Sequence, residues 1–204
     1  MKREVVPEQG ANVAKGERVY LRELLLSDVT DRYLSWFRDE SVVQFLASKN
    51  LSYEDVVQYI AFGKETKSYF MHAICVCEND LHIGNVKIGP IDWSSMRSDL
   101  VTVIGDTAYW GKGLATEAIS LGNKLAFDFY EMKEVLGHID ASNIGSLKSY
   151  FRAGWGETKR ISDPPSPELV CVSCFNPKYY SVEISGGKFQ SVQPRPSSTA
   201  PSQS

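Results

Sequence analysis

The sequence lacks a long hydrophobic run and a strong excess of charge of either sign. No apolar stretch approaches the roughly 20 residues that a membrane-spanning helix needs, and the N-terminal MKREVVPEQG has no hydrophobic signal core. The net charge is −3 and the pI is near 5.7, so the basic stripe typical of nucleic-acid binders is missing. These absences predict a cytoplasmic protein that binds neither a membrane nor a nucleic acid.

Cysteine is scarce as well. The four cysteines are Cys75, Cys77, Cys171 and Cys174. The Cys75-x-Cys77 spacing places two thiols on the same face of a strand, which suits a tetrahedral zinc site poorly. We interpret all four as buried, reduced thiols in strand-like segments and expect no metal. A zinc cluster built from the two pairs is the alternative.

The length and composition favour one domain. With 204 residues, of which 43% are hydrophobic, the chain can bury one sizeable core. We expect a polar lead-in over residues 1–16 and a single domain over 17–185. Residues 186–204 are rich in Ser and Pro and lack an apolar pattern, which predicts a disordered tail.

The hydrophobic pattern predicts alternating groups of helices and strands. We expect strands over residues 19–26, 68–76, 81–91, 99–105, 135–140, 155–162 and 168–175. We expect helices after Ser27 or Asp28, near Ser52, over 114–130 and after Asn143. This order predicts an α+β fold with a largely antiparallel sheet. One crossover through the 114–130 helix, between the strand with Val101 and the strand with Val135, would make two of its strands parallel.

The stretch VTVIGDTAYWGKGLATEA, residues 101–118, carries the clearest chemical signal. A strand with Val101, Val103 and Ile104, which we expect to be buried, leads through a turn with two glycines directly into a helix. Glycine lets the backbone approach a ligand closely, and the free N–H groups at a helix N-terminus attract phosphate. The stretch fits neither a Walker A loop nor a Rossmann fingerprint, because Gly113 and Thr116 stand at positions that those motifs assign to other residues.

Two motifs in this chain resemble those of the GNAT family, the GCN5-related N-acetyltransferases. The family pattern Gln/Arg-x-x-Gly-x-Gly/Ala matches the segment 110–115, with Trp110 at the Gln/Arg position. A tryptophan at this position resembles the RimJ/RimL-like branch of the family. In that branch, Trp-Gly-Lys-Gly is commonly followed by a small residue and then by Thr-Glu-Ala. The second pattern is Asn-x-x-small-x-x-x-Tyr-x-x-x-Gly-aromatic, matched by Asn143, Ser146, Tyr150, Gly154 and Trp155. The resemblance covers Glu17 to about Cys174.

The resemblance implies a fold, a cosubstrate and its binding residues. The fold would be that of the GNAT acyl-CoA N-acyltransferases, an α/β three-layer variant of α+β with a mixed, mostly antiparallel sheet and helices on both faces. Two parallel strands would splay apart to admit the pantetheine arm of acetyl-CoA. The residues expected to bind acetyl-CoA are Val103, Ile104, Trp110, Gly111, Lys112, Gly113, Leu114, Ala115, Thr116, Asn143, Ser146 and Tyr150.

Acetyl transfer to an amine needs a stabilised carbonyl oxygen and a proton for the departing thiolate. Backbone N–H groups near Val103 and Ile104 are our candidates for the carbonyl. Tyr150 is our candidate acid, because a phenol stays protonated at neutral pH. Asp99 is our candidate catalytic base, since related proteins often carry Glu there. The alternatives for the base are Asp106, His138 and Asp140, and some family members need no dedicated base.

We therefore expect an acetyl-CoA-dependent N-acetyltransferase acting on a small-molecule amine or a peptide amino terminus. The segments IGNVKIGPIDW and IGDTAYWGKG resemble amino-sugar acetyltransferases of surface-polysaccharide pathways, which favours a nucleotide-linked amino sugar. Protein N-terminal acetylation, as on ribosomal proteins, is the alternative acceptor, and antibiotics and polyamines stay open, as does a homodimer. A non-catalytic CoA-binding or sensing module and a plain scaffold domain are the alternatives from other classes.

Overall fold

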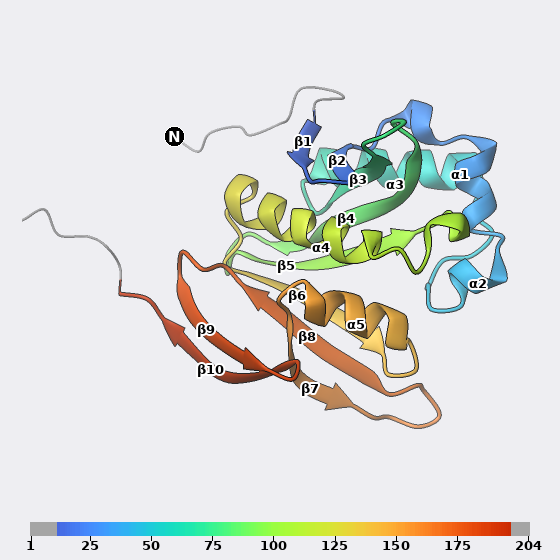
Figure 1. The fold of residues 1–204 in the computed structure, drawn as a ribbon. Helices are drawn as coiled ribbons and strands as arrows, with labels where there is room; N and C mark the ends of the chain where they lie inside the picture. The colour runs from blue at the N-terminus through green and yellow to red at the C-terminus, as the bar shows by residue number, and fades with distance from the viewer. Residues whose placement is uncertain (1–11, 197–204) are drawn as a thin grey trace, which may run out of the picture.

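A single mixed sheet of ten strands runs through the described part of the chain. The computed structural model describes residues 12–196 (Figure 1). The strands lie in the order β1-β2-β3-β4-β5-β6-β8-β7-β10-β9. The β5–β6 and β7–β10 pairs are parallel and the other pairs are antiparallel. The strands are β1 (Asn12–Lys15), β2 (Val19–Glu23), β3 (Phe70–Val76), β4 (His82–Asp92), β5 (Arg97–Ile104), β6 (Glu134–Asp140), β7 (Gly156–Ile161), β8 (Leu169–Phe175), β9 (Tyr180–Ser185) and β10 (Lys188–Pro194).

The helices connect the strands and cover both sheet faces. They are α1 (Asp31–Trp36), α2 (Glu40–Val43), α3 (Tyr53–Thr66), α4 (Leu114–Lys124) and α5 (Ile144–Arg152), with the short turns η1 (Leu26–Asp28) and η2 (Thr107–Tyr109). A π-helical turn, η3 (Leu125–Phe129), continues α4. Among the described residues, no helix is long and apolar enough to cross a membrane.

Two apolar clusters lie on opposite faces of the sheet. The larger cluster packs α4 and α5 against the side chains of Val86, Leu100 and Val135. The smaller cluster packs α1 and α3 against the other face, through residues such as Ala73 and Cys75. Successive side chains of a strand alternate between faces, so β2 and β3 contribute residues to both clusters. The α+β fold with helices on both faces, predicted from the sequence, is confirmed.

The parallel pair β5–β6 separates after three residue pairs. The two strands pair at Arg97↔Glu134, Ser98↔Val135 and Asp99↔Leu136, and then they diverge. An ion pair between Arg97 and Glu134, with Nε and Oε2 2.8 Å apart, closes the joined end. Beyond the fork β6 stays paired with β8 along its whole length. The edge of β5 from residue 100 onward is therefore left open toward β6.

Both ends of the chain carry more structure than the sequence pattern predicts. In the expected lead-in, β1 pairs with β2. In the expected tail, β10 pairs with β9, and the ring of Phe189 packs against Phe175 with centroids 5.3 Å apart. The expectation of disorder is thus wrong for residues 188–194. Phe189 anchors this segment to the sheet, and the average composition of the expected tail gave no sign of that contact. The rest of the expected tail, 197–204, lies outside the described residues.

Two local expectations are corrected too. The first α-helix begins one turn later than expected, because the side chain of Thr30, rather than Ser27 or Asp28, caps it by accepting a bond from Tyr33 N. The β5 strand is buried on one face only. Val101 is 39% exposed and Val103 half-buried, whereas Leu100 and Ile104 are buried. The helix expected after Asn143 is α5, and the Asn143 side chain caps it.

Candidate active site

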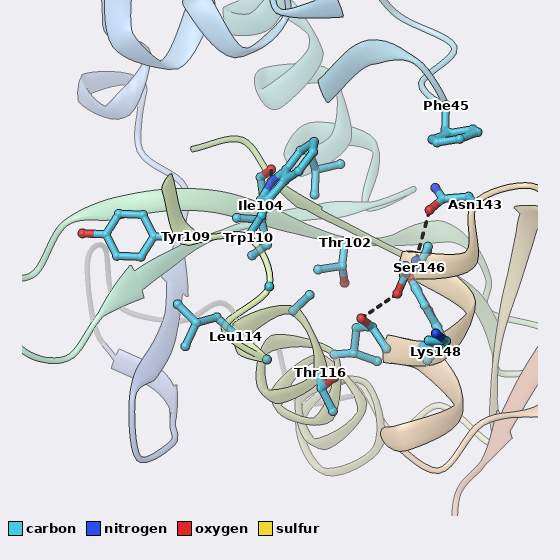
Figure 2. A pocket seen from close by; sticks show the side chains of 18 of the residues that line it. Phe45, Thr102, Ile104, Tyr109, Trp110, Leu114, Thr116, Asn143, Ser146 and Lys148 are labelled. Carbon is cyan, nitrogen blue, oxygen red and sulfur yellow. Dashed lines mark hydrogen bonds between the residues drawn. The ribbon is translucent and has the colours of Figure 1, made fainter. Parts of the chain in front are cut away.

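A cleft of about 490 Å³ opens where β5 and β6 separate (Figure 2). Its volume lies within the range usual for sites that hold cofactors and small ligands. The free edge of β5, the N-terminal turn of α4, one side of α5 and the segment 41–46 line it. The expected cofactor residues that line it are Val103, Ile104, Trp110, Gly111, Gly113, Leu114, Ala115, Thr116, Asn143, Ser146 and Tyr150.

The glycine turn has the conformation that its sequence predicts. Gly111 and Gly113 have φ angles of +72° and +75°, a region that side chains with a Cβ rarely adopt. A Cβ built on Gly111 would meet no atom within 4 Å, so its surroundings are open. Gly113 is the N-cap of α4 and has no side chain to satisfy the first N–H groups of the helix. These groups are left for a ligand.

Arg18 orients the peptide groups of this turn. Its guanidinium Nη1 donates to the carbonyl of Lys112 at 2.7 Å. The C=O and N–H of a trans peptide point in opposite directions, so the N–H of Gly113 points away from Arg18. The Glu117 carboxylate holds Arg18 in place, since Oε2 accepts from Arg18 Nε at 2.9 Å and Oε1 from Arg18 N at 2.8 Å. The carboxylate in the first turn of α4 is thus paired with a cation.

The open edge of β5 presents the main chain of alternate residues. The carbonyl of Leu100 accepts from Tyr150, and that of Ile104 accepts from Trp110 Nε1 at 2.8 Å. Both therefore face the opening, and Thr102, two residues from each, faces it as well. Val103 lies between two such residues, so its main chain points the other way, toward β4, and its carbonyl lies beside Gly84.

This geometry separates two residues that the sequence analysis grouped together. The main-chain N–H of Ile104 faces the opening, as expected for a donor to the thioester carbonyl. The expectation for Val103 is wrong, because the alternation of the strand turns its N–H away. The N–H of Thr102 faces the opening instead, and Val103 is still among the residues that line the cleft.

Two loop residues have positions that the sequence motif did not predict. The indole of Trp110 is 45% exposed and lies beside Ile104, tied to its carbonyl (Figure 2). Trp110, which stands at the Gln/Arg position, thus uses its side chain to hydrogen-bond the last carbonyl of β5. Lys112 does not line the cleft, and its ammonium lies 5.0 Å from the ring centroid of Tyr109. Lys112 therefore contributes through its backbone.

Tyr150 lies at the apex of the fork. Its side chain is buried, and its hydroxyl donates to the carbonyl of Leu100 at 2.9 Å, directly after the last β5–β6 pair. Burial raises the pKa of Tyr150 to about 12, although the hydroxyl and the main-chain N–H of Thr102 favour the phenolate and offset part of the rise. The phenol is therefore fully protonated at neutral pH and lies at the point where β5 and β6 begin to separate.

The second motif supplies the wall opposite the glycine turn. Asn143 Oδ1 accepts from Ser146 N at 3.1 Å, so this oxygen is used in capping α5. Figure 2 shows Asn143 and Ser146 on the same side of the cleft, across from Trp110. The structure thus brings the two motifs, about thirty residues apart in sequence, to opposite walls of one cleft.

The candidate bases lie in different settings. Asp106 is paired with Arg32, and its Oδ1 caps η2. Asp140 is engaged by the main chain and hydroxyl of Ser142, which lowers its pKa. Asp99 sits at the last β5–β6 pair but does not line the cleft. Burial raises its pKa, and the charges of His138 and Lys87 offset part of this rise.

The site's geometry agrees with the family to which the sequence is matched. A sequence model described as an acetyltransferase (GNAT) domain matches residues 18–155, which include the open strand, the glycine turn and Tyr150. The chain belongs to the GNAT family. No curated protein matches its sequence at a significant level.

Solved structures of GNAT enzymes share the fold at low sequence identity. A spermidine N-acetyltransferase from Vibrio cholerae, in complex with CoA and spermine, has a TM-score of 0.69 at 13% identity, covering 78% of this chain and 96% of that one. The aminoglycoside acetyltransferase AAC(6')-Ib, in complex with coenzyme A, has a TM-score of 0.64 at 18% identity, covering 77% and 94%. A ribosomal-protein-S5-alanine acetyltransferase from Vibrio fischeri has a TM-score of 0.66 at 13% identity, covering 80% and 96%.

The structure adds residues that the motifs did not indicate. Arg18 holds the glycine turn from the β1–β2 turn, almost a hundred residues earlier, and a sequence pattern gives no sign of that contact. Lys148 and Arg152 line the cleft from α5. Their spacing of four residues places both on one helix face, so the helical pattern contained this signal. Phe45, from the segment after α2, borders the mouth of the cleft (Figure 2).

Proposed function

We propose that this chain transfers an acetyl group from acetyl-CoA to a primary amine. The observation that carries the proposal is that one cleft joins three features: the unoccupied N–H groups at the start of α4, the open edge of β5 and the hydroxyl of Tyr150 at the fork. The first suits a diphosphate, the second an extended amide-containing arm, and the third a leaving thiolate. CoA contains all three chemical groups in this order.

Each residue then has a defined task in the reaction. The turn from Gly111 to Ala115 binds the diphosphate through its N–H groups. The main-chain N–H of Thr102 or Ile104 donates to the thioester oxygen as it becomes negative, and removing a donor of this kind typically costs about 3 kcal/mol of transition-state stabilisation. Tyr150 gives its proton to the sulfur. Asp99, which lies beside the fork but does not line the cleft, accepts the proton of the amine through water.

The charge of the cleft bears on the acceptor. No Asp or Glu is among the described residues that line it, and its charged groups are Lys148 and Arg152. A polycation such as a polyamine would find no carboxylate partner there. Neutral hydrogen-bonding side chains, Ser41 and Gln44, lie near the aromatic ring of Phe45 in one wall. These features favour an amine on a neutral or anionic molecule, and we propose a nucleotide-linked amino sugar.

The protein amino terminus is the second candidate acceptor. Trp110 followed by Gly-Lys-Gly-Leu-Ala-Thr-Glu supports a place in the RimJ/RimL-like branch, and the Vibrio fischeri enzyme named for ribosomal protein S5 has a similar fold. A peptide N-terminus brings a single amine, which the charge of the cleft permits. A sensing module would keep the diphosphate site without turnover.

Release of free CoA thiol tests the proposal. Acetyl-CoA is incubated with four acceptors: a nucleotide-linked amino sugar, a peptide with an N-terminal alanine, spermidine and an aminoglycoside. We expect kcat/KM for the amino sugar to exceed that for spermidine by at least about 100-fold, and Tyr150→Phe to slow release while the Kd for acetyl-CoA stays the same. Faster turnover of spermidine would reject the proposed acceptor. Binding of acetyl-CoA without thiol release for any acceptor would favour the sensing module.

A further inference from the structure

The hydroxyl of Thr102 is buried in the wall of the cleft without a hydrogen-bond partner. Its Oγ1 is shielded from solvent, and it is one of three side-chain atoms of the described residues that are buried and unpaired. The other two belong to Glu23 and His72, which do not line the cleft. An unpaired buried hydroxyl is destabilising, and in a native protein it calls for an explanation. A valine would fill the same space without that cost.

Thr102 lies near Tyr150, the proposed acid at the point where β5 and β6 separate. Thr102 lies two residues after Leu100 on β5, so both side chains point to the sheet face that α4 and α5 cover. The carbonyl oxygen of Leu100 accepts a hydrogen bond from the hydroxyl of Tyr150 at 2.9 Å. The hydroxyl and the main-chain N–H of Thr102 lie close enough to Tyr150 to favour its phenolate, and they lower its pKa against the effect of burial. Figure 2 shows Thr102 in the middle of the cleft, between Ile104 and the side chains of α5.

After proton transfer, the phenolate of Tyr150 needs a hydrogen-bond donor, and the carbonyl of Leu100, its contact before the reaction, cannot donate. Once Tyr150 gives up its proton, the carbonyl of Leu100 faces a phenolate and becomes a repulsive neighbour. Burial already disfavours that phenolate, and the thiol formed has an ordinary pKa near 8.5. Proton transfer is therefore uphill unless a donor stabilises the phenolate. Thr102 Oγ1–H is a donor with no other bond to break.

We propose that Thr102 is a positioning residue, whose hydroxyl donates to Tyr150 Oη as the phenol turns from Leu100 to the sulfur. This inference rests on the proposed function. The amine nitrogen bonds to the thioester carbon, the carbon–sulfur bond breaks, and the proton of Tyr150 moves to sulfur. The phenolate that remains accepts from Thr102 until water reprotonates it. The proton of the amine leaves through Asp99 or water.

Two substitutions at this position separate a catalytic effect from a structural one. Thr102→Val removes the hydroxyl and keeps the shape, and Thr102→Ser keeps the hydroxyl and removes a methyl group. We expect Thr102→Val to melt at the wild-type temperature or above, yet to lower kcat by about 10- to 100-fold, since the lost bond is to a charged group. We expect Thr102→Ser to melt lower while its kcat stays within about threefold of wild type.

A double-mutant cycle with Tyr150→Phe completes the test. Thr102→Val should change the residual rate of Tyr150→Phe by less than about twofold, because the two hydroxyls act as one unit. The Kd for acetyl-CoA should be equal in all variants. An equal loss of rate in both backgrounds, or a wild-type rate for Thr102→Val, would overturn the role of Thr102 while leaving the proposed function intact. Absence of wild-type turnover with every acceptor would reject both.

Discussion

Single residues decide how the cleft presents its N–H groups. Gly111 and Gly113 keep the turn in a conformation with positive φ, and Arg18 draws the carbonyl of Lys112 to the outside. The side chain of Trp110 closes the end of β5. Because the binding groups are main-chain atoms, their placement depends on backbone conformation more than on any particular side chain in the turn.

A matched pair of glycine substitutions tests this dependence. Gly111→Ala should lower the free energy of unfolding by about 1 kcal/mol, because alanine is strained at a φ of +72°, and should raise the Kd for acetyl-CoA by about tenfold or more. Gly186 has a φ of +59° and equally open surroundings in the β9–β10 turn. Gly186→Ala should cost the same stability and leave the Kd unchanged. Urea unfolding and calorimetry measure the two quantities, and equal Kd values for both variants would contradict the assignment of the turn.

At the scale of the element, α4 carries both the phosphate site and a contact with the far edge of the sheet. Glu117, in its first turn, binds the main chain of Arg18 and Val19 and the guanidinium of Arg18. Burial acts to raise the pKa of Glu117, but these hydrogen bonds outweigh it and lower the pKa below its ordinary value of 4.5. The contact ties the start of α4 to the β1–β2 turn, whose Arg18 orients the glycine turn.

The lowered pKa gives Glu117 a defined pH dependence. Its stabilisation is fully present above the unfolded-state value and is lost as pH falls through the lower, folded-state value. Glu117→Gln should reduce the free energy of unfolding by about 1 kcal/mol at pH 7, allowing for the exposure of Arg18. The difference from wild type should shrink below pH 4.5. Urea unfolding at a series of pH values measures it, and a constant difference down to pH 3 would show that the ion pair is not its source.

The helix α5 adds two cations to the opposite wall. Lys148 and Arg152 line the cleft and are exposed, so their attraction to phosphate groups should weaken with salt. Replacing both with Gln should raise the Kd for acetyl-CoA by about 3- to 10-fold in dilute buffer, and the effect should fade at high salt. Lys124 is an exposed cation of α4 that does not line the cleft, and Lys124→Gln is the control. The same increase for that control would refute a local effect.

At the scale of the whole molecule, the C-terminal hairpin extends the sheet beyond the family match. The domain model ends at residue 155, whereas β7 to β10 continue the sheet to Pro194. The ring of Phe189 packs against Gly156 so closely that a Cβ added to this glycine would lie 2.7 Å from the ring. The same ring also contacts Phe175. The hairpin is thus anchored away from the cleft.

This anchor predicts a loss of stability without a loss of binding. Phe189→Ala should lower the free energy of unfolding by about 2 kcal/mol, less than for a fully buried ring because Phe189 is half-buried. Ile184, 37% exposed on β9, is the control, and Ile184→Ala should cost less than about 1 kcal/mol. Neither variant should change the Kd for acetyl-CoA. A weaker affinity in Phe189→Ala would show that the hairpin supports the site.

The sequence by itself determined the local chemistry of this protein. Periodicity and capping residues located most strands and the helices α3, α4 and α5, and the spacing of glycines predicted the turn that starts α4. These features depend on neighbours in the chain, so a sequence contains them. The resemblance of two motifs then indicated the family and Tyr150.

The tertiary structure decided what depends on contacts between distant segments. It showed that Thr102, rather than Val103, faces the opening, because that choice follows from which strand pairs with which edge of β5. It placed Arg18 behind the glycine turn and moved residues 188–194 from an expected tail into the sheet. It also left the hydroxyl of Thr102 buried without a partner. Partners of this kind are fixed when the chain packs, and no local pattern specifies them.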